Sequence, residues 1–209
     1  MAKKIVITIA RQYGSGGREI GEKVAEMLGI PIFDKQLITD AASKGNLSED
    51  VLQRTDESAA NSLLYTLAVG SNVVGSSMPF GYKMPINDKL FILQSEVIKE
   101  YAKMGSCVII GRCSDYVLRE DKDVFRLFIY GDLEHRKERV RERHPEIKTA
   151  QLVDIINRTD RRRASYYNFY TGNKWGKYDN YDMAINSSTL GIQGTADLIV
   201  SCAKKLTEE

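Results

Sequence analysis

A glycine-rich turn between an apolar run and an amphipathic segment constrains this chain more than any other feature. Residues 5–9 are apolar and mostly β-branched, which predicts a central parallel strand covered on both faces. The segment after the turn carries apolar residues at helical spacing from about residue 18 and is ended by Gly29 and Pro31. The stretch therefore predicts a strand, a tight turn and a helix in immediate succession.

The turn is a candidate site for phosphate. Glycines remove side-chain bulk, so backbone N–H groups can surround an anion, and the N-terminus of the following helix adds the positive end of its dipole. A glycine-rich turn that binds no ligand is the alternative interpretation. The candidate nucleotide-binding residues are Arg11, Gly14, Ser15, Gly16, Gly17, Arg18 and Glu19.

The turn departs from the common nucleotide-binding pattern G-x-x-x-x-G-K-[ST], in which Lys reaches the outer phosphates and a hydroxyl binds Mg²⁺. Aligned on the phase of the helix, Arg11 replaces the first Gly, Gly17 the Lys and Arg18 the hydroxyl residue. A register one residue later reads Arg18 for the Lys and Glu19 for the hydroxyl, but shifts the apolar residues out of phase. In both registers the Lys is missing. Arg11 and Arg18 are predicted to supply the cation, because Arg binds phosphate with two parallel hydrogen bonds.

A second candidate site follows the predicted strand at residues 107–110. Ligands of open α/β sheets gather at the carboxyl edge of the strands, so Arg112 is predicted to bind the phosphate of a substrate. Asp115 either orients Arg112, contacts the sugar or base of that substrate, or is a carboxylate at the start of a helix.

Two arginine clusters lie on predicted helices. After the strand at 124–130, Arg136, Arg139 and Arg143 share one helix face with glutamates beside them, which favours a solvated, salt-bridged surface. The cluster at residues 158–163 is denser, and Asp160 lies within it. Converging guanidinium groups repel one another unless phosphate or carboxylates neutralise them, so this second cluster predicts a phosphate contact. A solvent-exposed cluster is the alternative interpretation.

Several segments together carry a resemblance to a known family. They are IVITIARQYGSGGREIGEKVAEMLG at residues 5–29, IFDKQLI at 32–38, IIGR at 109–112, the Arg-rich 158–163 and INSSTLG at 185–191. In this order they resemble the cytidylate kinase-like family, an offshoot of the P-loop nucleoside monophosphate kinases. The resemblance implies ATP and Mg²⁺ as cofactors and phosphoryl transfer to a nucleoside monophosphate, CMP or dCMP. The absent Lys leaves two alternatives: a binding protein without catalysis, or a kinase for another small acceptor.

The same resemblance implies roles for particular residues. Arg158 and Arg162 are expected to close over the transferring group from an Arg-rich lid at about residues 136–170, with Arg18 also catalytic. Asp34 is expected on the acceptor side, at the start of a helical insertion at about residues 35–86. No residue is predicted to bind a metal directly.

Alternating strands and helices predict one domain over residues 1–209. We expect a three-layer α/β fold of P-loop NTPase type, with a five-stranded parallel sheet and helical lid and acceptor-binding insertions. The irregular segment at residues 66–87 is a candidate lid or a contact in a homo-oligomer.

Composition narrows the partners. With 43% hydrophobic and 28% charged residues the chain is typical of a globular protein. A net charge of +2 is too small to indicate nucleic acid as a partner, so small-molecule nucleotides are the expected ligands. The sequence shows no signal peptide and no run long enough to cross a bilayer, and three cysteines lack metal-ligand spacing. We therefore predict a cytoplasmic protein with no membrane partner.

Overall fold

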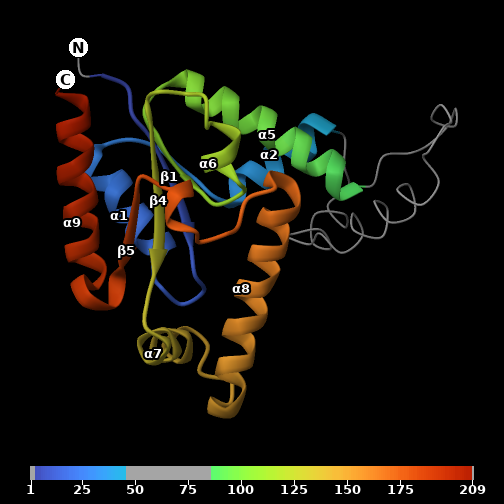
Figure 1. Ribbon diagram of the computed structural model, residues 1–209, viewed down its shortest axis with the longest axis vertical. Coiled ribbons are helices and arrows are strands. Elements are labelled where there is room, and N and C mark those ends of the chain that lie inside the picture. The colour runs from blue at the N-terminus through green and yellow to red at the C-terminus, as the bar shows by residue number, and fades with distance from the viewer. Residues whose placement is uncertain (1–2, 46–85, 209) are drawn as a thin grey trace, which may run out of the picture.

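The computed structural model describes residues 3–45 and 86–208, which form a five-stranded sheet between two layers of helices (Figure 1). The strands are β1 (Val6–Arg11), β2 (Ile32–Phe33), β3 (Cys107–Ile110), β4 (Val124–Tyr130) and β5 (Met183–Asn186). They are ordered β2-β3-β1-β4-β5, and every neighbouring pair is parallel. The predicted α/β class and five-stranded parallel sheet are confirmed.

The described helices agree closely with the sequence periodicity. They are α1 (Gly17–Leu28), α2 (Lys35–Gly45), α5 (Ile86–Met104), α6 (Ser114–Val117), α7 (Leu133–Arg143), α8 (Thr149–Thr171), the 3₁₀ turn η1 (Tyr178–Asn180) and α9 (Ser187–Thr207). Helix α9 breaks at Gly191, whose backbone is non-helical. None of these described helices has the length and apolar composition needed to cross a membrane. Residues 46–85 lie outside the described residues. They include most of the predicted acceptor-side insertion (about 35–86) and most of the candidate lid (66–87).

Helices cover both faces of the sheet. On one face Ile7 and Ile9 of β1 belong to a core that includes Ile20 of α1 and Ile199 of α9. On the other face the neighbouring residue Val6 belongs to a second core, which residues of α2 and α5 complete. Alternate side chains of one central strand are therefore buried in opposite directions, as the continuous apolar run predicts.

The carboxyl edge of the sheet carries the glycine turn, and α7 and α8 lie beyond that edge (Figure 1). The segment after α8 returns over the sheet, where the rings of Trp175 and Tyr181 contact Phe128 with centroids 5.2 and 5.1 Å away. This packing places the arginine-bearing helices next to the turn.

Candidate functional site

The glycine turn has a sharply defined backbone. Gly14 and Gly16 both have φ of +80°, a conformation that side chains other than glycine rarely adopt. Ser15 is wholly buried, and its hydroxyl donates to the carbonyl oxygens of Gln12 (2.9 Å) and Ile129 (3.2 Å). Helix α1 then begins at Gly17. The hydroxyl of Ser15 therefore shapes the turn and does not face a ligand.

The glycines also have a packing role that the sequence did not indicate. A Cβ added at Gly14 would lie 2.8 Å from the carbonyl oxygen of Arg136 in α7, and one at Gly17 would lie 2.6 Å from Cβ of Arg11. A Cβ at Gly16 would collide with Ile192 of α9. The absence of side chains at these glycines therefore makes room for α7, α9 and Arg11 of β1, in addition to any anion.

A cavity of about 250 Å³ opens in front of the turn. Its described walls are Arg11, Gln12, Tyr13, Gly14, Gly16, Gly17, Arg18, Asp34, Ile38, Arg112, Arg143, Arg162 and Arg163. Six of these residues are arginines and one, Asp34, is a carboxylate. We call this space the arginine cavity. Such an excess of guanidinium groups around an open volume favours a polyanionic ligand.

Most of the predicted site residues meet in the arginine cavity. Those that line it are Arg11, Gly14, Gly16, Gly17, Arg18, Asp34, Arg112 and Arg162. Four others do not line it: Ser15, Glu19, Asp115 and Arg158. Arg11 is the last residue of strand β1, and the glycines and Arg18 belong to the turn and the start of α1. Arg112 follows strand β3 after one glycine, Gly111.

Arg18 and Asp34 reach the cavity as a pair. Nε of Arg18 lies 3.3 Å from a carboxylate oxygen of Asp34 and 3.0 Å from one of Glu22. The side chain of Arg18 is half exposed, so water screens both ion pairs. The positive charge of Arg18, which was predicted to replace that of the missing Lys, is therefore partly neutralised by carboxylates.

Glu19 does not take the place of the magnesium-binding hydroxyl. Its carboxylate accepts hydrogen bonds of 2.7 Å from both Arg139 and Arg143. Burial acts to raise the pKa of Glu19, but the hydrogen bonds and charge of the two arginines outweigh burial and leave the pKa below its ordinary value.

The described residues do not fit a magnesium ion held by the protein at the turn. Arg18 stands at one candidate position for the hydroxyl, and Glu19 at the other is held by arginines. Among residues 3–45 and 86–208, no group of three His, Cys, Asp or Glu side chains is arranged to bind a metal.

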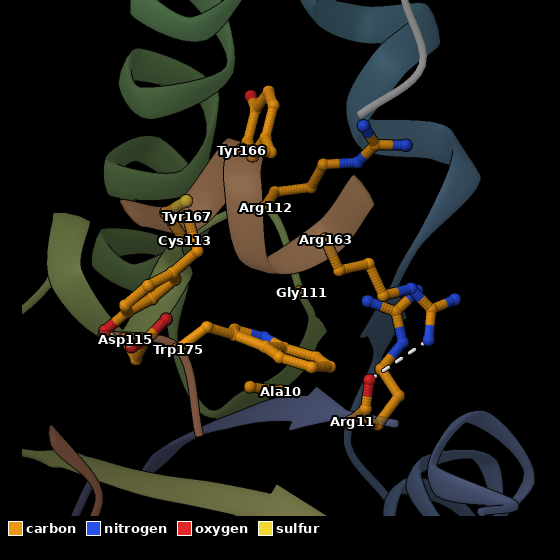
Figure 2. A pocket seen from close by; sticks show the side chains of 10 residues that line it. All are labelled: Ala10, Arg11, Gly111, Arg112, Cys113, Asp115, Arg163, Tyr166, Tyr167 and Trp175. Carbon is orange, nitrogen blue, oxygen red and sulfur yellow. Dashed lines mark hydrogen bonds between the residues drawn. The ribbon is translucent and has the colours of Figure 1, made fainter. Parts of the chain in front are cut away.

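Asp115 lies beside a smaller pocket of about 30 Å³ (Figure 2). Its carboxylate is buried in the first turn of α6 and accepts a 2.7 Å hydrogen bond from the hydroxyl of Tyr167. Burial raises the pKa of Asp115 to about 6. Arg112 turns its guanidinium away from Asp115 in Figure 2, so the interpretation that Asp115 orients Arg112 is wrong. Asp115 instead lies in the first turn of α6, as the alternative interpretation of a carboxylate at the start of a helix predicts.

Arg158 does not line the arginine cavity, although it was expected to bind phosphate. Arg163 lines the cavity instead. The side chain of Arg158 is exposed. Arg163 donates a 3.0 Å hydrogen bond to the carbonyl oxygen of Arg11, drawn in Figure 2, and its guanidinium lies over the ring of Tyr13. The signal was available: Ile156, Asp160, Arg163 and Tyr167 recur at the spacing of one buried face of α8.

The interpretation of the arginines on α7 as a solvated face is wrong for Arg136. This residue is 5% exposed, and its Nη2 donates a 2.8 Å hydrogen bond to Asp160 of α8. Burial lowers the pKa of Arg136, which the charge of Asp160 opposes. Val140, four residues later, is also buried and marks the face of α7 that is turned inward.

The strand order and the glycine turn define a three-layer α/β fold of P-loop type, and solved structures of kinases share this fold. A shikimate kinase from Bacteroides thetaiotaomicron is 14% identical, with a TM-score of 0.52 over 99% of this chain and 100% of its own. A gluconokinase from Sinorhizobium meliloti 1021 is 12% identical, with a TM-score of 0.53 over 100% and 96%. An uncharacterized protein from Eubacterium ventriosum ATCC 27560 is 24% identical, with a TM-score of 0.69 over 96% and 98%.

The family follows from the sequence match. Residues 6–189 match the model of the cytidylate kinase-like family, and the chain belongs to that family. No curated protein sequence matches the chain.

Proposed function

We propose that this protein transfers a phosphoryl group from ATP to a nucleoside monophosphate, with CMP or dCMP as the first candidates. The observation that carries the proposal is the arginine cavity in front of the glycine turn. The transition state of phosphoryl transfer spreads negative charge over three oxygens, and fixed positive groups stabilise that charge. Membership of the cytidylate kinase-like family supports the same reaction class.

The residues of the cavity divide between the two substrates. The turn and the start of α1 bind the phosphates of ATP, with Arg11 and Arg163 supplying charge that the missing Lys would have given. Arg112 binds the phosphate of the acceptor, with Asp34 and Arg18 beside it. Arg162 closes the outer wall. Catalysis in this scheme is by position and charge, without a covalent intermediate. Mg²⁺ would accompany ATP and offset the charge of its phosphates.

A coupled assay of ADP release tests the proposal. ATP is supplied with CMP, dCMP, UMP, AMP, shikimate or gluconate, and we expect the highest kcat/KM with CMP or dCMP. Arg112→Lys keeps the charge but loses the two-pronged donor, so kcat/KM should fall about 10- to 100-fold. Arg119→Lys is the matched control, because Arg119 does not line the arginine cavity. No ADP release with any acceptor, while ATP still binds, would contradict the proposal.

A second candidate function is nucleotide binding without catalysis. It is favoured by the absent Lys and by the glycine turn, whose residues pack against α7 and α9. Arg11→Ala and Arg18→Ala separate the two candidates. A kinase loses turnover in these variants, whereas a binding protein shows no turnover in the parent chain and loses only affinity for ATP.

A further inference from the structure

Helix α8 contacts the glycine turn through a carboxylate as well as through its arginines. One oxygen of Asp160 accepts a 2.7 Å hydrogen bond from the backbone N–H of Tyr13, and the other accepts a 2.8 Å bond from Nη2 of Arg136. The two side chains are 15% and 6% exposed. Asp160 therefore joins three elements, α7, α8 and the turn, at one shielded point.

Tyr13 is fastened by its ring as well as by its amide. The ring packs against a small apolar core formed by Val140 of α7 with Leu152 and Ile156 of α8. One turn along α8 from Asp160, Arg163 bonds to the carbonyl oxygen of Arg11. The turn is thus held on both sides of Gln12, by an amide contact at residue 13 and a carbonyl contact at residue 11.

The carboxylate lies behind the turn and not in the space open to a ligand. Tyr13 and Arg163 line the arginine cavity, whereas Asp160 and Arg136 do not. A ligand in the cavity therefore leaves Asp160 in place. Nε of Arg136 has no hydrogen-bond partner in the described part of the chain, and Asp160 is the carboxylate that pairs with this buried guanidinium. Removing a partner from a buried ion pair leaves its charge uncompensated.

We propose that Asp160 is a positioning residue for phosphate binding: it fixes the Tyr13 amide and seats α8 so that Arg162 and Arg163 face the arginine cavity. The inference rests on the proposed function for the identity of the ligand, but the contacts that carry it do not. Groups that bind a reacting phosphate must be held within a fraction of an ångström, and a second layer of hydrogen bonds supplies that precision.

The test compares Asp160→Asn with Asp154→Asn. Asp154 lies on the same helix, is exposed and is absent from the cavity wall, so its variant removes an equal charge. Hydrogen exchange of the peptide spanning residues 11–18 is measured by mass spectrometry, and the affinity for inorganic pyrophosphate by calorimetry. In Asp160→Asn we expect about tenfold faster exchange and about tenfold weaker binding, as for loss of a charged hydrogen bond. Asp154→Asn should match the parent in both.

Kinetics separate positioning from folding. In Asp160→Asn the KM for ATP should rise about tenfold, whereas a mere loss of folded protein would lower kcat and leave KM unchanged. If no acceptor is turned over, the proposed function fails, but exchange and pyrophosphate binding still decide the role of Asp160. Parent-like exchange and affinity in Asp160→Asn would overturn the inference. Should that variant not fold, NMR exchange of the Tyr13 amide in the parent decides: protection supports the contact, and exchange at the rate of an unstructured peptide overturns it.

Discussion

Arg136 and Arg139 on α7 are each bound to a carboxylate from another element, whereas Arg162 on α8 faces the open arginine cavity. Both helices carry arginines at similar spacing, yet Arg136 and Arg139 of α7 hold parts of the protein together. Arg162 has no ion pair among the described residues and is placed to bind a ligand. The role of an arginine on these helices therefore depends on whether a neighbouring element offers it a carboxylate, and not on how many arginines surround it.

The largest effect should come from breaking the buried pair on the α7 side. Arg136→Met removes the cation that is hydrogen-bonded to the shielded carboxylate of Asp160 and leaves only the more distant charge of Arg163, so the free energy of unfolding should fall by about 3 kcal/mol. Urea denaturation measures this loss. Arg141→Met, on the exposed face of the same helix, should change stability by less than about 0.5 kcal/mol. Equal stabilities for the two variants would remove the distinction between the faces of α7.

Asp115 is a buried carboxylate without an arginine hydrogen bond. Its contribution to the free energy of unfolding should therefore change with pH in the opposite sense to that of Glu19. Burial raises the pKa of Asp115 to about 6 in the folded protein, so the folded state holds the proton more tightly than the unfolded state. Protonated Asp115 therefore stabilises the fold below about pH 4, and this contribution is lost as pH rises through 6. The free energy of unfolding should change by about 3 kcal/mol over that range.

The difference in unfolding free energy between the parent chain and Asp115→Asn isolates this contribution. Measured from pH 4 to pH 7.5, the difference should shift against the parent as pH rises to about 6 and then level off. Parallel curves for the two proteins over that range would show that Asp115 does not titrate as its burial requires.

Arg162→Ala should weaken ligand binding with little change in stability. Loss of one guanidinium from the cavity wall should raise the dissociation constant for ATP about tenfold, because hydrogen bonds to charged groups contribute at about this level. Arg158→Ala is the matched control on the same helix and should leave affinity unchanged, since Arg158 is exposed and does not line the cavity. Calorimetric titration of both variants checks the pair; an equal loss of affinity in both would mean that α8 acts only through its overall charge.

The smallest effect is expected at the exposed contact between α1 and α7. Glu19 is 39% exposed, and Glu19→Gln removes its ion pairs with Arg139 and Arg143 at a cost of about 0.5–1 kcal/mol of stability. Thermal unfolding in low salt and in about 1 M NaCl measures this, and the difference from the parent should shrink at high salt. A salt-independent loss would mean that Glu19 acts through packing.

Much of the fold could be predicted from local patterns. The runs at residues 107–110 and 124–130 are strands with the predicted bounds, because continuous apolar residues between turn signals leave few alternatives. The rule that ligands gather at the carboxyl edge of a parallel sheet placed Arg112 beside the glycine turn, as the cavity shows.

The buried charges could not be predicted in the same way. An arginine in a helix is assigned to solvent by default, since its burial requires a partner that lies far away in sequence. Arg136 and its partner Asp160 are 24 residues apart, and their contact exists only once α7 and α8 pack together. The sequence does not single out Arg163 within its cluster for the same reason: the buried face of α8 passes through charged residues as well as apolar ones.

Titration of ATP into the parent protein tests most directly whether a glycine turn without Lys binds polyphosphate through surrounding arginines. At about 50 mM salt we expect saturable binding with a dissociation constant between about 1 μM and 1 mM, the usual range for enzyme substrates. The affinity should fall at about 300 mM salt, because charge dominates the wall of the cavity. Absence of binding at low salt, or an affinity unaffected by salt, would contradict the account.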